Sequence, residues 1–176
     1  MKSRIYPIAV FLIGSLLFSC EKSDLEYEND FQNSRNAWLD FKESSNNSYK
    51  YVVLGGSVFT DYGWETTITV SNGTITQRHF RYISNTELPD TIPEEEAEWT
   101  ENEAEINNRE FTSAAQALTL DEIYNEAQQN WLLRRNNTKV YFEAGNNGLI
   151  SSCIYIEDGC MDDCFNGIKI KSIQAL

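Results

Sequence analysis

The residues best suited to binding a metal ion lie close together near the C-terminus, in a loop between two predicted strands. Four carboxylates and one amide gather there: Glu157, Asp158, Asp162, Asp163 and Asn166. Calcium takes about six to eight oxygen ligands, and this loop offers part of such a set. Its spacing differs from that of an EF-hand. Asp162 and Asp163 are adjacent, so in an extended backbone they point to opposite sides and make a poor acid/base pair. The loop is therefore a candidate calcium site, and otherwise a solvated acidic turn; no other cofactor is predicted.

Three cysteines accompany this loop, and one pair of them is spaced for a disulfide. If Ile156 lies opposite Ile168 in the hairpin, Cys160 falls opposite Cys164. Directly opposed Cβ atoms lie about 4.5–5.5 Å apart, close to the range for a disulfide. The spacing favours a Cys160–Cys164 bond that leaves Cys153 unpaired, and Cys153 remains an alternative partner for either cysteine.

Other residues offer little support for catalysis. His79 is the only histidine, and no Ser–His–Asp arrangement can be assembled around it. Gly55-Gly56 lacks the residues that complete a phosphate-binding loop. The segment 57–64 carries Phe59, Tyr62 and Trp64, which either form an aromatic binding lip or cap the core. The binding-site hypothesis is a pocket that joins Tyr62 and Trp64 to the acidic loop at 158–163.

The spacing of apolar residues indicates the elements that position these groups. Apolar residues recur every three or four positions in 28–43 and 119–135, which predicts two helices. Thr119 and Glu122 form the signature of a capping box at the start of the second helix. Runs of aromatic and β-branched residues predict six strands, over 49–54, 64–71, 74–83, 138–144, 149–156 and 167–173.

One hairpin is specified in detail by its turn. Asn72-Gly73 favours a type I′ turn, because both residues tolerate positive φ. This turn pairs Val70 with Ile75. The apolar phase slips between Ile75 and Phe80, which predicts either a β-bulge in the returning strand or an early exposed edge.

The predicted order is helix, three strands, insert, helix, three strands. We therefore expect an α+β fold in which two helices pack on an antiparallel sheet of about six strands, built as a duplicated αβββ unit. The single domain spans 31–176 and contains an acidic insert at 84–112. Ten acidic residues and one basic residue lie within 87–110. Such a run is typical of a solvated loop or a poorly ordered insert, with 94–106 as a candidate for a frayed helix.

The N-terminus has the pattern of an export signal. Lys2 and Arg4 precede an apolar run over 8–18, which is shorter than the stretch of about 20 residues that spans a bilayer. We interpret residues 1–19 as a signal peptide and residues 20–30 as a polar tether.

The end of this signal resembles the lipobox of bacterial lipoproteins, through Leu17, Ser19 and Cys20. The resemblance implies cleavage before Cys20 and diacylglycerol on its thiol, so that lipid anchors the chain to a membrane. It further implies an exported lipoprotein of a Gram-negative envelope, in the outer membrane.

Residues 31–174 resemble a domain of unknown function found in small secreted proteins and lipoproteins. The residues that carry this similarity are the Trp38 helix, Ser48-Tyr49-Lys50-Tyr51, Val70-Ser71-Asn72-Gly73, Thr119-Leu120-Asp121-Glu122, Gly148-Leu149-Ile150 and Asp162-Asp163. The family carries no assigned activity, so the similarity transfers no functional residue.

The net charge of −13 excludes nucleic acid as a partner, because an acidic surface repels phosphate. Membrane attachment is therefore expected through lipid on Cys20 and not through surface charge. We expect a lipid-anchored envelope lipoprotein whose non-enzymatic domain binds an unidentified protein or small molecule. The alternative is an acidic, calcium-dependent hydrolase.

Overall fold

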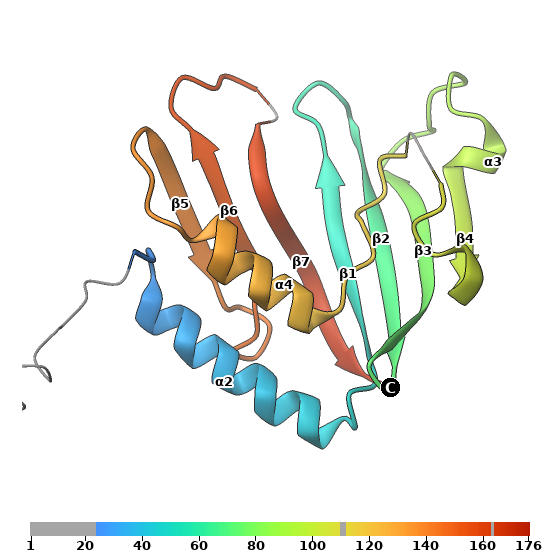
Figure 1. Cartoon of the computed structure of the whole chain (residues 1–176). Coiled ribbons are helices and arrows are strands. Elements are labelled where there is room, and N and C mark those ends of the chain that lie inside the picture. Colours follow the sequence, from blue (N-terminus) through green and yellow to red (C-terminus); the bar gives the residue numbers. More distant parts are fainter. Residues whose placement is uncertain (1–23, 110–111, 163) are drawn as a thin grey trace, which may run out of the picture.

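The computed structural model describes residues 24–109, 112–162 and 164–176. These residues form an α+β fold whose seven antiparallel strands make one sheet, in the order β4-β3-β2-β1-β7-β6-β5 (Figure 1). The strands are β1 (Tyr49–Gly56), β2 (Tyr62–Ser71), β3 (Thr74–Ser84), β4 (Glu98–Asn102), β5 (Thr138–Glu143), β6 (Ser152–Glu157) and β7 (Phe165–Ala175). The α+β class is as predicted, with one strand more than expected.

Two helices cover one face of this sheet (Figure 1). They are α2 (Glu28–Ser44) and α4 (Leu120–Glu126), which continues as a π-helical turn, η3 (Ala127–Trp131). The capping box of α4 is confirmed, because Thr119 Oγ1 accepts from the N–H of Glu122 at 3.2 Å and the Glu122 carboxylate accepts from the N–H of Thr119 at 2.7 Å. Both predicted helices are present, and the second ends at Trp131 instead of continuing to residue 135.

The core lies between these helices and the sheet. Apolar positions of α2, α4 and the central strands are fully enclosed there, including Phe31, Trp38, Tyr49, Tyr51, Ile68, Leu120 and Ile123. Aromatic rings dominate the centre: Trp38 meets Tyr49 edge-to-face at 5.3 Å and stacks on Tyr124 at 6.2 Å. The amphipathic pattern of α2 thus faces inward, as its spacing predicted.

The β2–β3 hairpin follows its turn residues. Asn72 and Gly73 have φ values of 50° and 81°, and Val70 is paired with Ile75. The register shifts between Thr69 and Val70, which places the predicted bulge in the first residues of β3.

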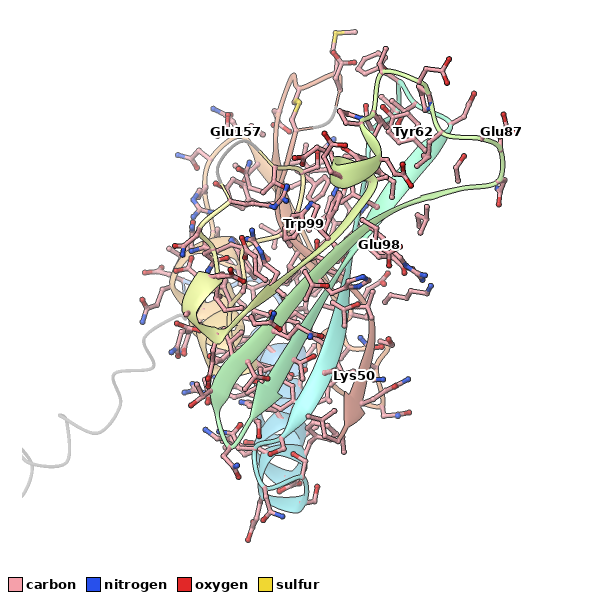
Figure 2. The ribbon with its side chains drawn as sticks, turned by 90° about the vertical axis from the view of Figure 1, so that its right-hand side faces the viewer. Lys50, Tyr62, Glu87, Glu98, Trp99 and Glu157 are labelled. Carbon is pink, nitrogen blue, oxygen red and sulfur yellow. A yellow bond between two sulfur atoms is a disulfide. The ribbon has the colours of Figure 1, made fainter. Side chains whose placement is uncertain are left out.

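The acidic insert is partly structured, which corrects the expectation of a solvated loop. It contains a short helix, α3 (Glu94–Ala97), a 3-10 turn, η2 (Glu103–Glu105), and the edge strand β4 where a frayed helix was expected. Two contacts with β3 hold β4 on the sheet. Arg78 Nε lies 2.9 Å from Glu101 Oε2, and Trp99 stacks on Phe80 at 5.2 Å. Figure 2 shows Trp99 on the inner side of β4 and Glu98 on its outer side.

Candidate functional site

The sheet opens between its central strand, β1, and the neighbouring strand β7. Pairing of β1 with β7 ends at Val53 and Ile170, although β1 stays paired with β2 as far as Gly56. β7 likewise stays paired with β6 as far as Phe165. Within the described part of the chain, residues 54–56 and 165–169 therefore have a strand neighbour on one side only. Figure 1 shows β1 and β7 diverging toward the β1–β2 and β6–β7 loops.

A cleft occupies this divergence and has a pocket on each side of the sheet. The pocket on the helix side has a volume of about 350 Å³ and is lined by the core residues Val53 and Ile168 together with Trp64 and Ala115. Six residues line both pockets: Leu54, Gly55, Gly56, Ser57, Phe165 and Lys169. These shared residues belong to the two separating strands and the start of the β1–β2 loop.

The pocket on the opposite side of the sheet is larger, at about 460 Å³. Ile154 and Ile156 form its apolar wall, and Asp162 lies at its rim. Ile154 follows Cys153, which is a core residue, and successive strand residues face opposite sides of a sheet. The two pockets therefore meet through the gap between β1 and β7.

Glycine is required on both walls of the cleft. A Cβ atom on Gly55 would overlap the indole of Trp64, so that ring lies directly against the β1 backbone. Gly167 has a φ of 133°, and a Cβ there would overlap the backbone of Cys153. A glycine inside a strand often marks a close backbone approach, and this signal was readable in the sequence at both positions.

Lys169 is the basic residue common to both pockets. Its ammonium lies 4.9 Å from the centre of the Phe165 ring, and no carboxylate of the described residues lies within ion-pair distance. The neighbouring Lys171 is engaged differently, because its ammonium binds Glu65 at 2.6 Å. The cleft therefore carries an exposed ammonium that lies beside the Phe165 ring.

Glu65 is held on the outer face of the sheet, opposite Leu54 of the cleft wall. Its carboxylate accepts hydrogen bonds from Lys171 at 2.6 Å and from Arg81 Nη2 at 2.7 Å. The hydrogen bond from Lys171 holds the pKa of Glu65 below its ordinary value, Arg81 adds to this, and burial opposes it. This clamp ties β2, β3 and β7 together next to the cleft.

Exposed apolar side chains surround the mouth of the cleft. Val58 and Phe59, in the β1–β2 loop, are each 73% exposed. Met161, in the β6–β7 loop, is 92% exposed. Val58 and Asp162 line the same outer pocket, so the two loops border one opening.

The disulfide joins Cys160 and Cys164, whose Cα atoms are 6.2 Å apart, and leaves Cys153 free and buried. The hairpin register from which this pair was predicted is nevertheless wrong. Ile156 lies opposite Phe165, and Ile168 lies opposite Cys153. Pairing ends before the loop, so both bonded cysteines belong to the loop and not to opposed strand positions. Burial raises the pKa of the Cys153 thiol to about 12.

The candidate calcium ligands are spread over the β6–β7 loop and its flanks. Glu157 ends β6, Asp158 donates its N–H to the carbonyl of Asn137 at 2.8 Å, and Asn166 lies in β7. Asp162 lies at the cleft rim, and Asp163 lies outside the described residues. Within the described ranges, no group of three or more His, Cys, Asp or Glu side chains is placed to hold a metal ion.

The aromatic segment contributes to the cleft through one of its three rings. Trp64 lines the inner pocket, whereas Tyr62 packs edge-to-face on Tyr82 at 5.5 Å and Phe59 is exposed at the mouth. His79 lies elsewhere, with Nε2 2.9 Å from the Glu98 carboxylate. The sequence thus pointed to Trp64 and Asp162, but gave no sign of Lys169, whose role depends on where β1 and β7 separate.

The proposed lipidation residue, Cys20, lies outside the described residues. Within them, no helix combines the length and apolar character needed to cross a membrane. No protein-family model, curated protein or solved structure matches this chain.

Proposed function

We propose that this chain is a lipoprotein of the Gram-negative cell envelope, anchored in the outer membrane by lipid on Cys20, whose folded domain is a non-enzymatic binding domain. The ligand site is the cleft between β1 and β7. The lipobox residues Leu17, Ser19 and Cys20 support the anchor. The two-sided cleft supports the binding role.

The observation that carries the binding role is the chemistry of the cleft walls. Its surface combines aliphatic and aromatic side chains with one ammonium, from Lys169, and one carboxylate, from Asp162. Concave, mostly apolar surfaces with a few placed polar groups are typical of ligand sites. The described residues that line the cleft include no histidine, and its one cysteine, Cys164, is disulfide-bonded. The lining therefore fits recognition better than acid–base or nucleophilic catalysis.

The anchor is tested by growing a Gram-negative host that expresses the full chain with radiolabelled palmitate. We expect label in the wild-type protein and sedimentation with outer membranes, and neither in a Cys20→Ala variant. Label that fails to enter the wild-type chain, or a Cys20→Ala variant that still sediments with membranes, would contradict the anchor.

The binding role is tested on a secreted form, in which a removable leader without the lipobox cysteine replaces residues 1–20. The probe is 1-anilinonaphthalene-8-sulfonate, whose rings fit the apolar walls and whose sulfonate suits Lys169. A Gly56→Trp variant is designed to fill the cleft, because Gly56 lines both pockets and a Cβ atom there has room, with the Cα of Gly63 as its nearest neighbour at 3.9 Å. The matched control is Lys50→Trp, at an exposed position of the same strand that lines neither pocket.

We expect probe fluorescence with the wild-type domain and with Lys50→Trp, and its loss with Gly56→Trp. Figure 2 shows Lys50 on the side of the sheet opposite the helices. Equal fluorescence from all three proteins, or none from the wild type, would contradict the assignment of the cleft as a ligand site.

A further inference from the structure

We infer, resting on the proposed binding role of the cleft, that its ligand is an extended segment of another polypeptide that inserts as an additional strand between β1 and β7. Three independent features of the cleft support this occupant: its backbone edges, the placement of its pockets and its charge. Together they select an extended peptide over a compact small molecule.

Both walls of the cleft are strand edges that face it with their backbone. Residues 54–56 and 165–169 each have a strand partner on one side and face the cleft with the other. In an antiparallel ladder, alternate residues direct their N–H and C=O groups to the same neighbour, so both walls offer hydrogen-bonding groups to the cleft. A strand placed between two edges forms a hydrogen-bonded ladder with each of them. A peptide that binds to the outer edge of a sheet normally forms a ladder on one side only.

The two pockets of the cleft match the alternating side chains of an extended peptide. Successive side chains of an extended peptide point to opposite faces of the sheet it joins. The cleft has one pocket on each face: the inner one beside Trp64 and Ala115, the outer one beside Ile154 and Ile156. An inserted segment therefore places alternate side chains in alternate pockets. Both pockets are lined mainly by apolar groups, so apolar residues are expected at each.

The direction and length of the segment follow from its walls. β1 and β7 are antiparallel to one another. A strand between them must therefore be antiparallel to one and parallel to the other. The shorter wall is 54–56 and the longer is 165–169, so the inserted part is about three to five residues long at about 3.3 Å per residue.

Charge comes third. Lys169 lines both pockets, and no carboxylate of the described residues lies within ion-pair distance of it. Its backbone belongs to the longer wall, so its side chain lies beside the inserted segment. The peptide is therefore expected to bring a carboxylate to Lys169, either from Asp or Glu or from a free C-terminus.

The experiment uses the full lipoprotein in nonionic detergent. A phage library of random heptapeptides is selected on the wild-type protein and counter-selected on Gly56→Trp, and enriched peptides are synthesised. Each is compared with an analogue that is N-methylated at two alternate residues, which keeps the side chains but removes ladder donors. Binding is measured by calorimetry on the wild type, Lys169→Met and the exposed control Lys50→Met. Backbone hydrogen exchange is followed by mass spectrometry.

We expect enriched peptides that alternate apolar residues and carry a carboxylate. N-methylation should weaken them by about tenfold or more, since it removes two of the donors that form the ladders. Lys169→Met should weaken them by severalfold and Lys50→Met should not. Exchange should slow at residues 54–56 and 165–169 together.

Equal affinity of the N-methylated analogue, or slowed exchange elsewhere, would overturn strand insertion. Failure to enrich any peptide while 1-anilinonaphthalene-8-sulfonate still binds the secreted form would overturn the peptide ligand and leave the binding role standing. Loss of both would overturn the proposed function itself. Slowed exchange at both walls in the wild-type protein alone, with a dimer in size-exclusion chromatography, would show that a second copy of the chain is the occupant and would also overturn the inference.

Discussion

The phenolic oxygen of Tyr49 accepts a hydrogen bond of 2.8 Å from the backbone N–H of Leu120, the first residue of α4. Two positions further along β1, the hydroxyl of Tyr51 donates to the carbonyl of Leu118. Residues two apart in a strand share a face, so both hydroxyls reach the same segment. The Tyr-x-Tyr pair therefore fixes the start of α4 against the centre of the sheet.

Removing either hydroxyl should destabilise the domain. Tyr51→Phe leaves the Leu118 carbonyl without its partner, and Tyr49→Phe does the same to the Leu120 N–H. An unsatisfied buried polar group costs about 1–3 kcal/mol, so each variant should lower the free energy of unfolding by that amount in urea titrations. Tyr141→Phe is the control, because that ring is 44% exposed. Changes below about 0.5 kcal/mol in all three variants would contradict this account.

Local signals in the sequence predicted the elements that they govern. The α4 start followed from Thr119 and Glu122, whose mutual hydrogen bonds need only neighbouring residues. The β2–β3 turn followed from Asn72-Gly73, which set the pairing of Val70 with Ile75. In both cases the physical cause lies within a few residues of the signal.

The insert and the cleft depend on distant residues, and the sequence did not predict their structure. The count of charged residues alone led to the prediction of a loop at 84–112, because no neighbouring residue indicates that Glu101 will contact Arg78 on β3. The last hairpin was given the wrong register because Ile156 was placed opposite Ile168, whereas Ile156 lies opposite Phe165. The cleft exists because β1 and β7 pair only as far as Val53 and Ile170, which no run of neighbouring residues encodes.

The Arg78–Glu101 pair should be essential for holding β4 on the sheet. Both residues are buried, at 3% and 4% exposure, and the Glu101 carboxylate also accepts from the N–H groups of Asn107 and Arg109 at 2.9 Å each. Glu101→Gln leaves the guanidinium without a counter-charge, which costs about 3–5 kcal/mol for a buried pair. Guanidinium chloride unfolding measures this, with exposed Glu103→Gln as the control. A loss under about 1 kcal/mol would mean that the pair does not anchor β4.

Glu65 should make stability depend on pH in acid. Its pKa in the folded state is lowered from the ordinary value of 4.5, so folding is favoured above that value and the contribution disappears as pH falls through the lower, folded-state pKa. Glu65→Gln should therefore be less stable than the wild type at pH 7, and the difference should shrink below pH 4.5. Urea titrations from pH 7 to pH 3 test this, with exposed Glu87→Gln expected to track the wild type. A difference that stays constant with pH would show that the carboxylate charge is not the cause.

Cys153 should be chemically silent in the folded protein. It is fully buried in the core, and burial raises the pKa of its thiol to about 12, so very little thiolate exists at neutral pH. Alkylation by iodoacetamide requires the thiolate and access to it. Mass spectrometry of the peptide that contains Cys153 should therefore find no label at pH 8 in native buffer, and full label after unfolding in urea. A Phe59→Cys variant provides the matched control, because position 59 is 73% exposed and its thiol should react without denaturant. If Cys153 reacted in native buffer at a rate similar to that control, the core beneath β6 would have to open readily. The cleft would then lack the rigid wall that β6 and β7 provide.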